Sequence, residues 1–237
     1  MREPLLRERL LGVLFPSSCY CCGELVENGR FLCPDCEESL TYYRVRRMKT
    51  IRRHGQAFSI RACYSYQEAA KEAILRLKFE HQVRPAKYMG EAIADRVKAA
   101  PSVRPDVITF VPMLLSKEMR VGYNPPQLIA EHAGKWLRLP VRRLLKKNDY
   151  TLAQHTLSAN QRKQNVVGAF SACGDVKGKR ILLVDDVVTT GSTLSECASE
   201  LLKAGASAVC PIAYASTGGK PRVDREESLE YNKSTSS

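Results

Sequence analysis

The chain has 237 residues, of which 44% are hydrophobic, and a formal net charge of +12. This composition predicts a packed core and excludes a largely disordered chain, and the length accommodates one sizeable α/β domain with a small additional module. The positive charge favours anionic partners such as phosphates or nucleic acid; a basic surface that serves only solubility is the alternative.

Residues 3–14 carry leucines and a valine near helical spacing, which predicts a short amphipathic helix. We expect this helix to dock on the rest of the protein, and a helix at a membrane surface is the alternative. Charges interrupt its apolar residues, unlike those of a signal peptide, and no stretch approaches 18 apolar residues. The sequence therefore predicts no membrane span.

Four cysteines follow as two C-x-x-C pairs, namely Cys19, Cys22, Cys33 and Cys36. Four thiolates on two short knuckles suit tetrahedral Zn²⁺, and a site with four protein ligands has a structural role. A redox C-x-x-C is the alternative. Cys21 is interpreted as a buried thiol beside the ligands, or as a replacement for one of them. We expect Cys33→Ser to unfold this module and to leave the α/β domain folded.

The next segment, residues 44–54, is strongly basic and contains no acid. It is interpreted as a linker or an exposed basic surface between two units. Its cations are candidates for contacts to a nucleic-acid backbone, with Tyr42 and Tyr43 as stacking groups; a solvated linker is the alternative. The candidate residues are Arg44, Arg46, Arg47, Lys49, Arg52 and Arg53.

Predicted strands and helices then alternate through residues 57–216, which predicts an α/β domain with a mainly parallel sheet and flanking helices. The predicted division is 1–50 for the N-terminal helix and cysteine module, 57–216 for the α/β domain and 217–237 for a polar, disordered tail. The predicted strands are 57–66, 105–112, 180–184 and 207–215, and the predicted helices are 67–79, 86–100, 126–139 and 193–206. A second basic patch lies at residues 138–147, and Lys78 and His81 are weaker phosphate candidates.

An acid pair, Asp185 and Asp186, follows the strand 180–184, and a small polar turn leads into the helix 193–206. The turn consists of Thr189, Thr190, Gly191, Ser192 and Thr193. A helix N-terminus with backbone N–H groups suits a phosphate, while carboxylates accept hydroxyl groups and hold hydrated Mg²⁺. A ribose 5-phosphate meets both requirements. The chain lacks the G-x-x-x-x-G-K-[ST] motif that a P-loop NTPase needs.

The stretch "ILLVDDVVTTGST" resembles the phosphoribosyl-diphosphate (PRPP) signature of type I phosphoribosyltransferases. The chain resembles the ComF family of competence-associated proteins, through its four-cysteine start, "FVPMLL", "GYN", "GAF" and this signature. The resemblance implies a type I phosphoribosyltransferase fold preceded by a zinc ribbon. It implies that Asp185 and Asp186 meet the ribose hydroxyls and Mg²⁺, that Thr189 to Thr193 wrap the 5-phosphate, and that Val111 and Pro112 face the diphosphate.

Arg162 falls in the family's mobile segment and is the best candidate for a diphosphate clamp, because a guanidinium fork matches phosphate oxygens. The chain departs from the family pattern at three places near the predicted diphosphate site. Phe110 stands where the family has a proline, Val121 where it has an arginine, and Asn124-Pro125-Pro126 where it has N-Q-A. These departures bear on turnover rather than on phosphate binding.

Two functions remain open from the sequence. One is a PRPP-binding protein of DNA uptake in natural transformation, with single-stranded DNA and other competence proteins as partners. The alternative is an active Mg²⁺-dependent phosphoribosyltransferase that uses a nitrogen nucleophile. The family resemblance implies a bacterial protein located in the cytoplasm. A position at the periphery of the inner membrane is the alternative. We expect the basic run and the PRPP site to act independently, because over 100 residues separate them.

Overall fold

The computed structural model describes residues 17–27, 30–46, 48–100, 102–148 and 168–218. The predicted helix 3–14, Arg47, Arg162 and most of the predicted tail therefore lie outside the described residues. Within the described part, no helix has both the length and the apolarity needed to cross a membrane.

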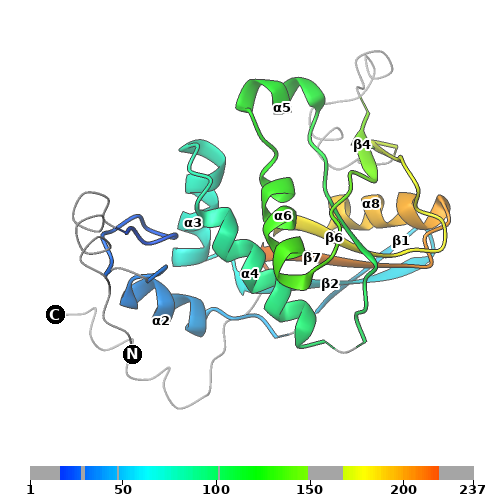
Figure 1. Cartoon of the computed structure of the whole chain (residues 1–237). Coiled ribbons are helices and arrows are strands. Elements are labelled where there is room, and N and C mark those ends of the chain that lie inside the picture. The colour runs from blue at the N-terminus through cyan, green and yellow to red at the C-terminus, as the bar shows by residue number, and fades with distance from the viewer. Residues whose placement is uncertain (1–16, 28–29, 47, 101, 149–167, 219–237) are drawn as a thin grey trace, which may run out of the picture.

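The centre of the molecule is a five-stranded sheet, and its strands lie in the order β1-β2-β7-β6-β3. All neighbours pair in parallel except β1 and β2, which form an antiparallel hairpin (Figure 1). The strands are β1 (Lys49–Arg53), β2 (Gln56–Ser65), β3 (Val107–Phe110), β6 (Arg180–Val188) and β7 (Ala208–Ser216). A separate antiparallel pair consists of β4 (Leu145–Lys147) and β5 (Phe170–Ala172). The predicted mainly parallel sheet is thus confirmed.

Helices cover both faces of the sheet and create two apolar cores. Alternate side chains of a strand point to opposite faces. Accordingly, Leu182 and Val184 of β6 belong to the core beneath α3 (Glu68–Phe79), α4 (Pro85–Lys98) and α6 (Pro125–Leu137). Ile181 and Leu183 belong to the core beneath α8 (Ser192–Lys203). A continuous apolar run is the expected sequence of a strand buried on both faces.

The carboxyl ends of β3 and β6 lie side by side, because Phe110 is aligned with Val184 in the parallel register. The short helix α5 (Leu115–Val121) follows β3, and α8 follows β6. Ligands of open α/β sheets bind beyond such strand ends. The fold therefore brings the predicted segments at Val111–Pro112 and Asp185–Thr193 to one edge of the sheet.

The cysteine module packs directly on α3 and shares its core. Helix α2 (Pro34–Tyr42) begins immediately after Cys33 and lies beside α3 (Figure 1). Cys19, Cys33 and Leu40 bury themselves in the same apolar cluster as Ile74 and Leu77 of α3. The module is therefore part of the main body of the protein in its packing.

The prediction of a linker over residues 44–54 is wrong for most of the segment. Lys49–Arg53 form β1 at the edge of the sheet, paired residue by residue with β2. Val45 is buried, and its N–H donates to the carbonyl of Cys63. Sequence reasoning missed this strand because its composition is basic, whereas the strand is formed by pairing with the apolar β2.

Candidate functional site

The acid pair lies inside β6 rather than after it. The strand continues past Val184 because β7 remains as a partner, with Asp185 aligned with Ala213. Both carboxylates are buried, with exposures of 8% for Asp185 and 6% for Asp186. The carboxylate of Asp185 accepts the backbone N–H of Asp186 at 2.9 Å, and that of Asp186 accepts the N–H of Val187 at 2.6 Å. Burial, aided by the neighbouring Asp186, raises the pKa of Asp185 well above its ordinary value, and Lys78 opposes this shift.

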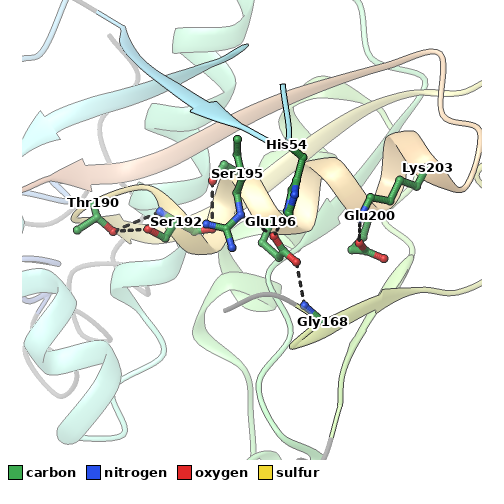
Figure 2. A network of polar contacts seen from close by, with 9 residues as sticks. His54, Gly168, Thr190, Ser192, Ser195, Glu196, Glu200 and Lys203 are labelled. Carbon is green, nitrogen blue, oxygen red and sulfur yellow. Dashed lines mark hydrogen bonds and ion pairs between the residues drawn. The ribbon is translucent and has the colours of Figure 1, made fainter. Parts of the chain in front are cut away.

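The polar turn after β6 presents an uncapped helix N-terminus. Gly191 is the N-cap residue of α8, with a φ of +86°, and it makes no side-chain capping bond. The N–H of Ser192 reaches only the hydroxyl of Thr190, at 3.3 Å, and these two hydroxyl groups lie 3.0 Å apart (Figure 2). A larger residue at position 191 would clash with β1, because its Cβ atom would lie 1.9 Å from the Cδ1 of Ile51. The first N–H groups of α8 therefore offer a site for an anion.

The segment after β3 completes the same edge of the sheet. The N–H of Val111 donates to the carbonyl of Val184 at 2.9 Å, which places Val111 beside Asp185. The side-chain amide of Asn124, itself buried, donates to the Val111 carbonyl at 3.1 Å. Val111 and Pro112 are both buried. The structure thus brings together the acid pair, the turn and the Val111–Pro112 segment, while Arg162 lies outside the described residues.

Lys78 joins this group from the last turn of α3. Its ammonium group lies 2.8 Å from the Oδ2 of Asp186. Burial would lower the pKa of Lys78, but the neighbouring carboxylates, Asp186 first and then Asp185, together raise it above its ordinary value. The sequence marked Lys78 only as a weak phosphate candidate, because α3 and β6 are distant in the chain.

A third buried carboxylate, Glu196, lies on α8 one turn from the polar turn. Its Oε2 accepts Arg53 at 2.6 Å and lies 3.0 Å from the Nε2 of His54, while its Oε1 accepts the N–H of Gly168 at 3.0 Å (Figure 2). Burial would raise the pKa of Glu196, but these partners, Arg53 first, lower it. Sequence reasoning missed Glu196, since a glutamate in a helix gives no local sign of burial.

The structure divides the basic run into bound and exposed side chains. Lys49 donates to the carbonyl of Thr189 at 2.5 Å, and Arg53 is held by Glu196. Arg44, Arg46 and Arg52 are exposed, and Arg47 lies outside the described residues. The reason given for independence from the PRPP site, separation along the chain, does not hold, because Lys49 and Ile51 of β1 lie against Thr189 and Gly191 of the turn. The independence of PRPP binding itself stays a prediction.

The four predicted cysteine ligands converge. The Sγ atoms of Cys19, Cys22, Cys33 and Cys36 all lie within 4.8 Å of one another, and those of Cys22 and Cys33 are 3.6 Å apart. Four ligands about 2.3 Å from a tetrahedral zinc lie about 3.8 Å from each other. The cluster therefore fits Zn²⁺ in size and in ligand chemistry.

Cys21 lies beside this cluster and is fully buried. Hydrogen bonding from Cys21 is the main cause that lowers the pKa of Cys19 to about 3 and of Cys36 to about 7. The same contacts raise the pKa of Cys21 itself. Cys21 is thus a buried thiol beside the cluster, as in the first of the two interpretations of the sequence.

Two separate regions of the chain are similar to known protein domains. Residues 138–234 match the phosphoribosyl transferase domain, and residues 10–48 match the double zinc ribbon domain. The chain is 30% identical to competence protein F of Haemophilus influenzae over 181 aligned residues. The aligned residues are 73% of this chain and 79% of that protein. The chain belongs to the ComF family.

A second relative is the DNA utilization protein YhgH of Escherichia coli K12. The two chains are 29% identical over 196 residues, which are 81% of this chain and 86% of that protein. Among solved structures, the allosteric regulatory enzyme of purine biosynthesis is 27% identical over 54% of this chain and 25% of its own, with a TM-score of 0.39. The matched domains and the parallel sheet establish a phosphoribosyltransferase-type fold preceded by a zinc ribbon.

Proposed function

We propose that this ComF-family protein binds PRPP or a related phosphoribosyl ligand at the carboxyl ends of β3 and β6, and that it serves DNA uptake in natural transformation. The observation that carries the proposal is the convergence of three elements at one edge of the sheet. These are the buried acid pair, the uncapped N-terminus of α8 and the Val111–Pro112 segment. The role in DNA uptake rests on relatives named competence protein F and DNA utilization protein.

Each element of the site matches one part of the ligand. Backbone N–H groups at Gly191–Thr193 and the hydroxyls of Thr190 and Ser192 suit the 5-phosphate. The carboxylates of Asp185 and Asp186 suit the ribose diol, because ionised carboxylates accept hydroxyl protons. Mg²⁺, when bound, would offset the charge of a diphosphate, and the acid pair would hold it only where Lys78 releases Asp186. Val111 and Pro112 would face the diphosphate, and Arg162 remains the proposed clamp.

Replacing both acids by the isosteric amide tests this assignment. Asp185→Asn with Asp186→Asn should weaken PRPP binding in the presence of Mg²⁺ at least about tenfold, or about 1.4 kcal/mol, because a neutral amide is a weaker acceptor for the ribose hydroxyls than an ionised carboxylate. Isothermal calorimetry measures the effect. Asp175→Asn is the control, since Asp175 is exposed and pairs only with Lys179 in the described structure. Unchanged affinity in the double variant would show that the site lies elsewhere.

DNA binding, in this proposal, uses the exposed part of the basic run. Single-stranded DNA should bind without strong sequence preference and with an affinity that falls steeply with salt. Changing Arg44, Arg46 and Arg52 to Ser should lower the salt slope by up to about 2, at about 0.7 per phosphate contact. Fluorescence anisotropy at several salt concentrations measures the slope. Arg53 and Lys49 are spared, because their loss would disturb Glu196 and the turn.

The matched control for this experiment removes the same charge from the second basic patch. Arg138, Arg142 and Lys146 are exposed, and their change to Ser should leave the salt slope unaltered. If this second triple variant lowers the slope and the first does not, the DNA-binding surface is the patch at 138–147.

The same site supports the alternative function of an active phosphoribosyltransferase. The observation in its favour is that the acid pair and the start of α8, with the turn between them, lie on consecutive segments of the chain. Diphosphate release from PRPP, assayed with a panel of nucleobases and amines, decides between the two functions. Acceptor-dependent release assigns the enzyme, whereas binding without release assigns a ligand-binding role.

A further inference from the structure

The acid pair has a cation of its own, supplied by the protein. Lys78 Nζ lies 2.8 Å from Asp186 Oδ2, and the Lys78 side chain is 32% exposed while that of Asp186 is 8% exposed. Asp185 also acts on Lys78 by charge. A contact of this length between a buried carboxylate and a mostly covered ammonium is a charge-assisted hydrogen bond.

The backbone around Lys78 is held firmly in this position. Leu77, the preceding residue, is fully buried in the core, and its carbonyl accepts the hydroxyl of Tyr123. Tyr123 precedes Asn124, whose amide holds the carbonyl of Val111 at the end of β3. The end of α3 is therefore tied to the same segments that form the rest of the site.

This arrangement leaves little room for a metal on Asp186. One oxygen of the carboxylate accepts the N–H of Val187 at 2.6 Å, and the other accepts Lys78. Mg²⁺ requires near-octahedral oxygen ligands and loses its water reluctantly. A divalent cation at Asp186 would also lie close to the ammonium group and be repelled by it. Either Lys78 moves away, or the site operates without the metal.

We propose that Lys78 is the resident counter-ion of the acid pair and replaces Mg²⁺, so that the site binds phosphoribosyl ligands without a divalent metal. An ammonium group has three donors, so that Lys78 can hold Asp186 and still donate to a ligand oxygen. The ligand class is a 5-phosphorylated ribose with a free diol, including ribose 5-phosphate as well as PRPP. This inference rests on the proposed function.

Calorimetry of PRPP and of ribose 5-phosphate, each in EDTA and in Mg²⁺, tests the proposal. Wild-type protein should bind both ligands with dissociation constants that differ less than about threefold between the two conditions. Lys78→Met should bind at least tenfold more weakly in EDTA and recover most of that loss in Mg²⁺, because the metal can then occupy the acid pair. Lys78→Arg keeps the charge and should retain binding in EDTA.

The matched control is Lys71→Met, which removes an exposed lysine from the same helix and should change nothing. The wild-type comparison alone overturns the inference if PRPP binds at least tenfold more tightly in Mg²⁺ than in EDTA, even if Lys78→Met fails to fold. Equal metal dependence in wild type and in folded Lys78→Met also overturns it. If wild type binds neither ligand in either condition, the proposed function itself fails, and this inference fails with it.

Discussion

Replacing Cys33 by serine should release one zinc ion per chain and lower the melting temperature of the whole protein. Structural zinc in small modules contributes about 10–16 kcal/mol of apparent binding free energy, which becomes folding free energy. A loss of about 1 kcal/mol lowers the melting temperature of a domain of this size by about 2–4 °C. We therefore expect a decrease of at least about 10 °C, measured by calorimetry together with metal analysis.

The destabilisation should extend to α3, contrary to the expectation from the sequence that the α/β domain stays folded. The side chain of Arg76 donates to the carbonyl of Cys22 at 2.6 Å. The same guanidinium packs against Gly23, where an added Cβ would stand 2.3 Å from it. Because Cys19 and Cys33 share a core with Ile74, a disordered cysteine module would expose the outer face of α3 to water.

Cys173→Ser is the matched control for this experiment. Cys173 is half-buried, and its thiol contacts only the carbonyl of Arg143 in the described structure. Its replacement should leave the zinc content unchanged. A wild-type protein that is metal-free and fully folded, or a Cys33→Ser variant that melts as wild type does, would contradict the structural role of the metal.

The sequence predicted the parts of the fold and site that local patterns encode. The run Ile181–Val184 is apolar at every position, a pattern expected for a strand or helix that is buried on both sides. The turn that follows the acid pair has the composition of a phosphate-binding loop. The two C-x-x-C pairs likewise specify a metal site by spacing alone. In each case the residues that act together are neighbours in the chain.

The parts that the sequence did not predict depend on contacts between distant segments. Lys78 lies more than 100 residues before Asp186, and no local sequence pattern around either residue predicts their ion pair. The composition of β1 is typical of a charged linker, and the segment forms a strand because it pairs with β2. The partner of Arg53 is a glutamate on α8, which is distant in the sequence. Local sequence patterns predict the sheet and the turn of the ligand site, whereas the ion pairs around them can be identified only from the three-dimensional structure.

The pair of Arg53 and Glu196 leads to the last prediction. Arg53→Met should lower the free energy of unfolding at pH 7 by about 3 kcal/mol, because it leaves a buried carboxylate without its cation. Glu196 is fully buried, and its side chain is 1% exposed against 18% for Arg53. His54 and the N–H of Gly168 still contact Glu196, so that the loss should fall at the lower end of the range for broken buried pairs. Urea unfolding measures the loss.

The pH dependence and a neighbouring arginine separate this pairing from a general effect of lost charge. The pKa of Glu196 is lowered from its ordinary value of 4.5, so its stabilising effect is present above about pH 4.5 and is lost as the pH falls through the folded value. The difference between wild type and Arg53→Met should therefore shrink as the pH falls below about 4.5. Arg52→Met, on the exposed side of the same strand, should change stability by less than about 0.5 kcal/mol. Equal losses in the two variants, or a loss in Arg53→Met that does not change with pH, would mean that Arg53 stabilises the hairpin by packing and that Glu196 is neutralised by other groups.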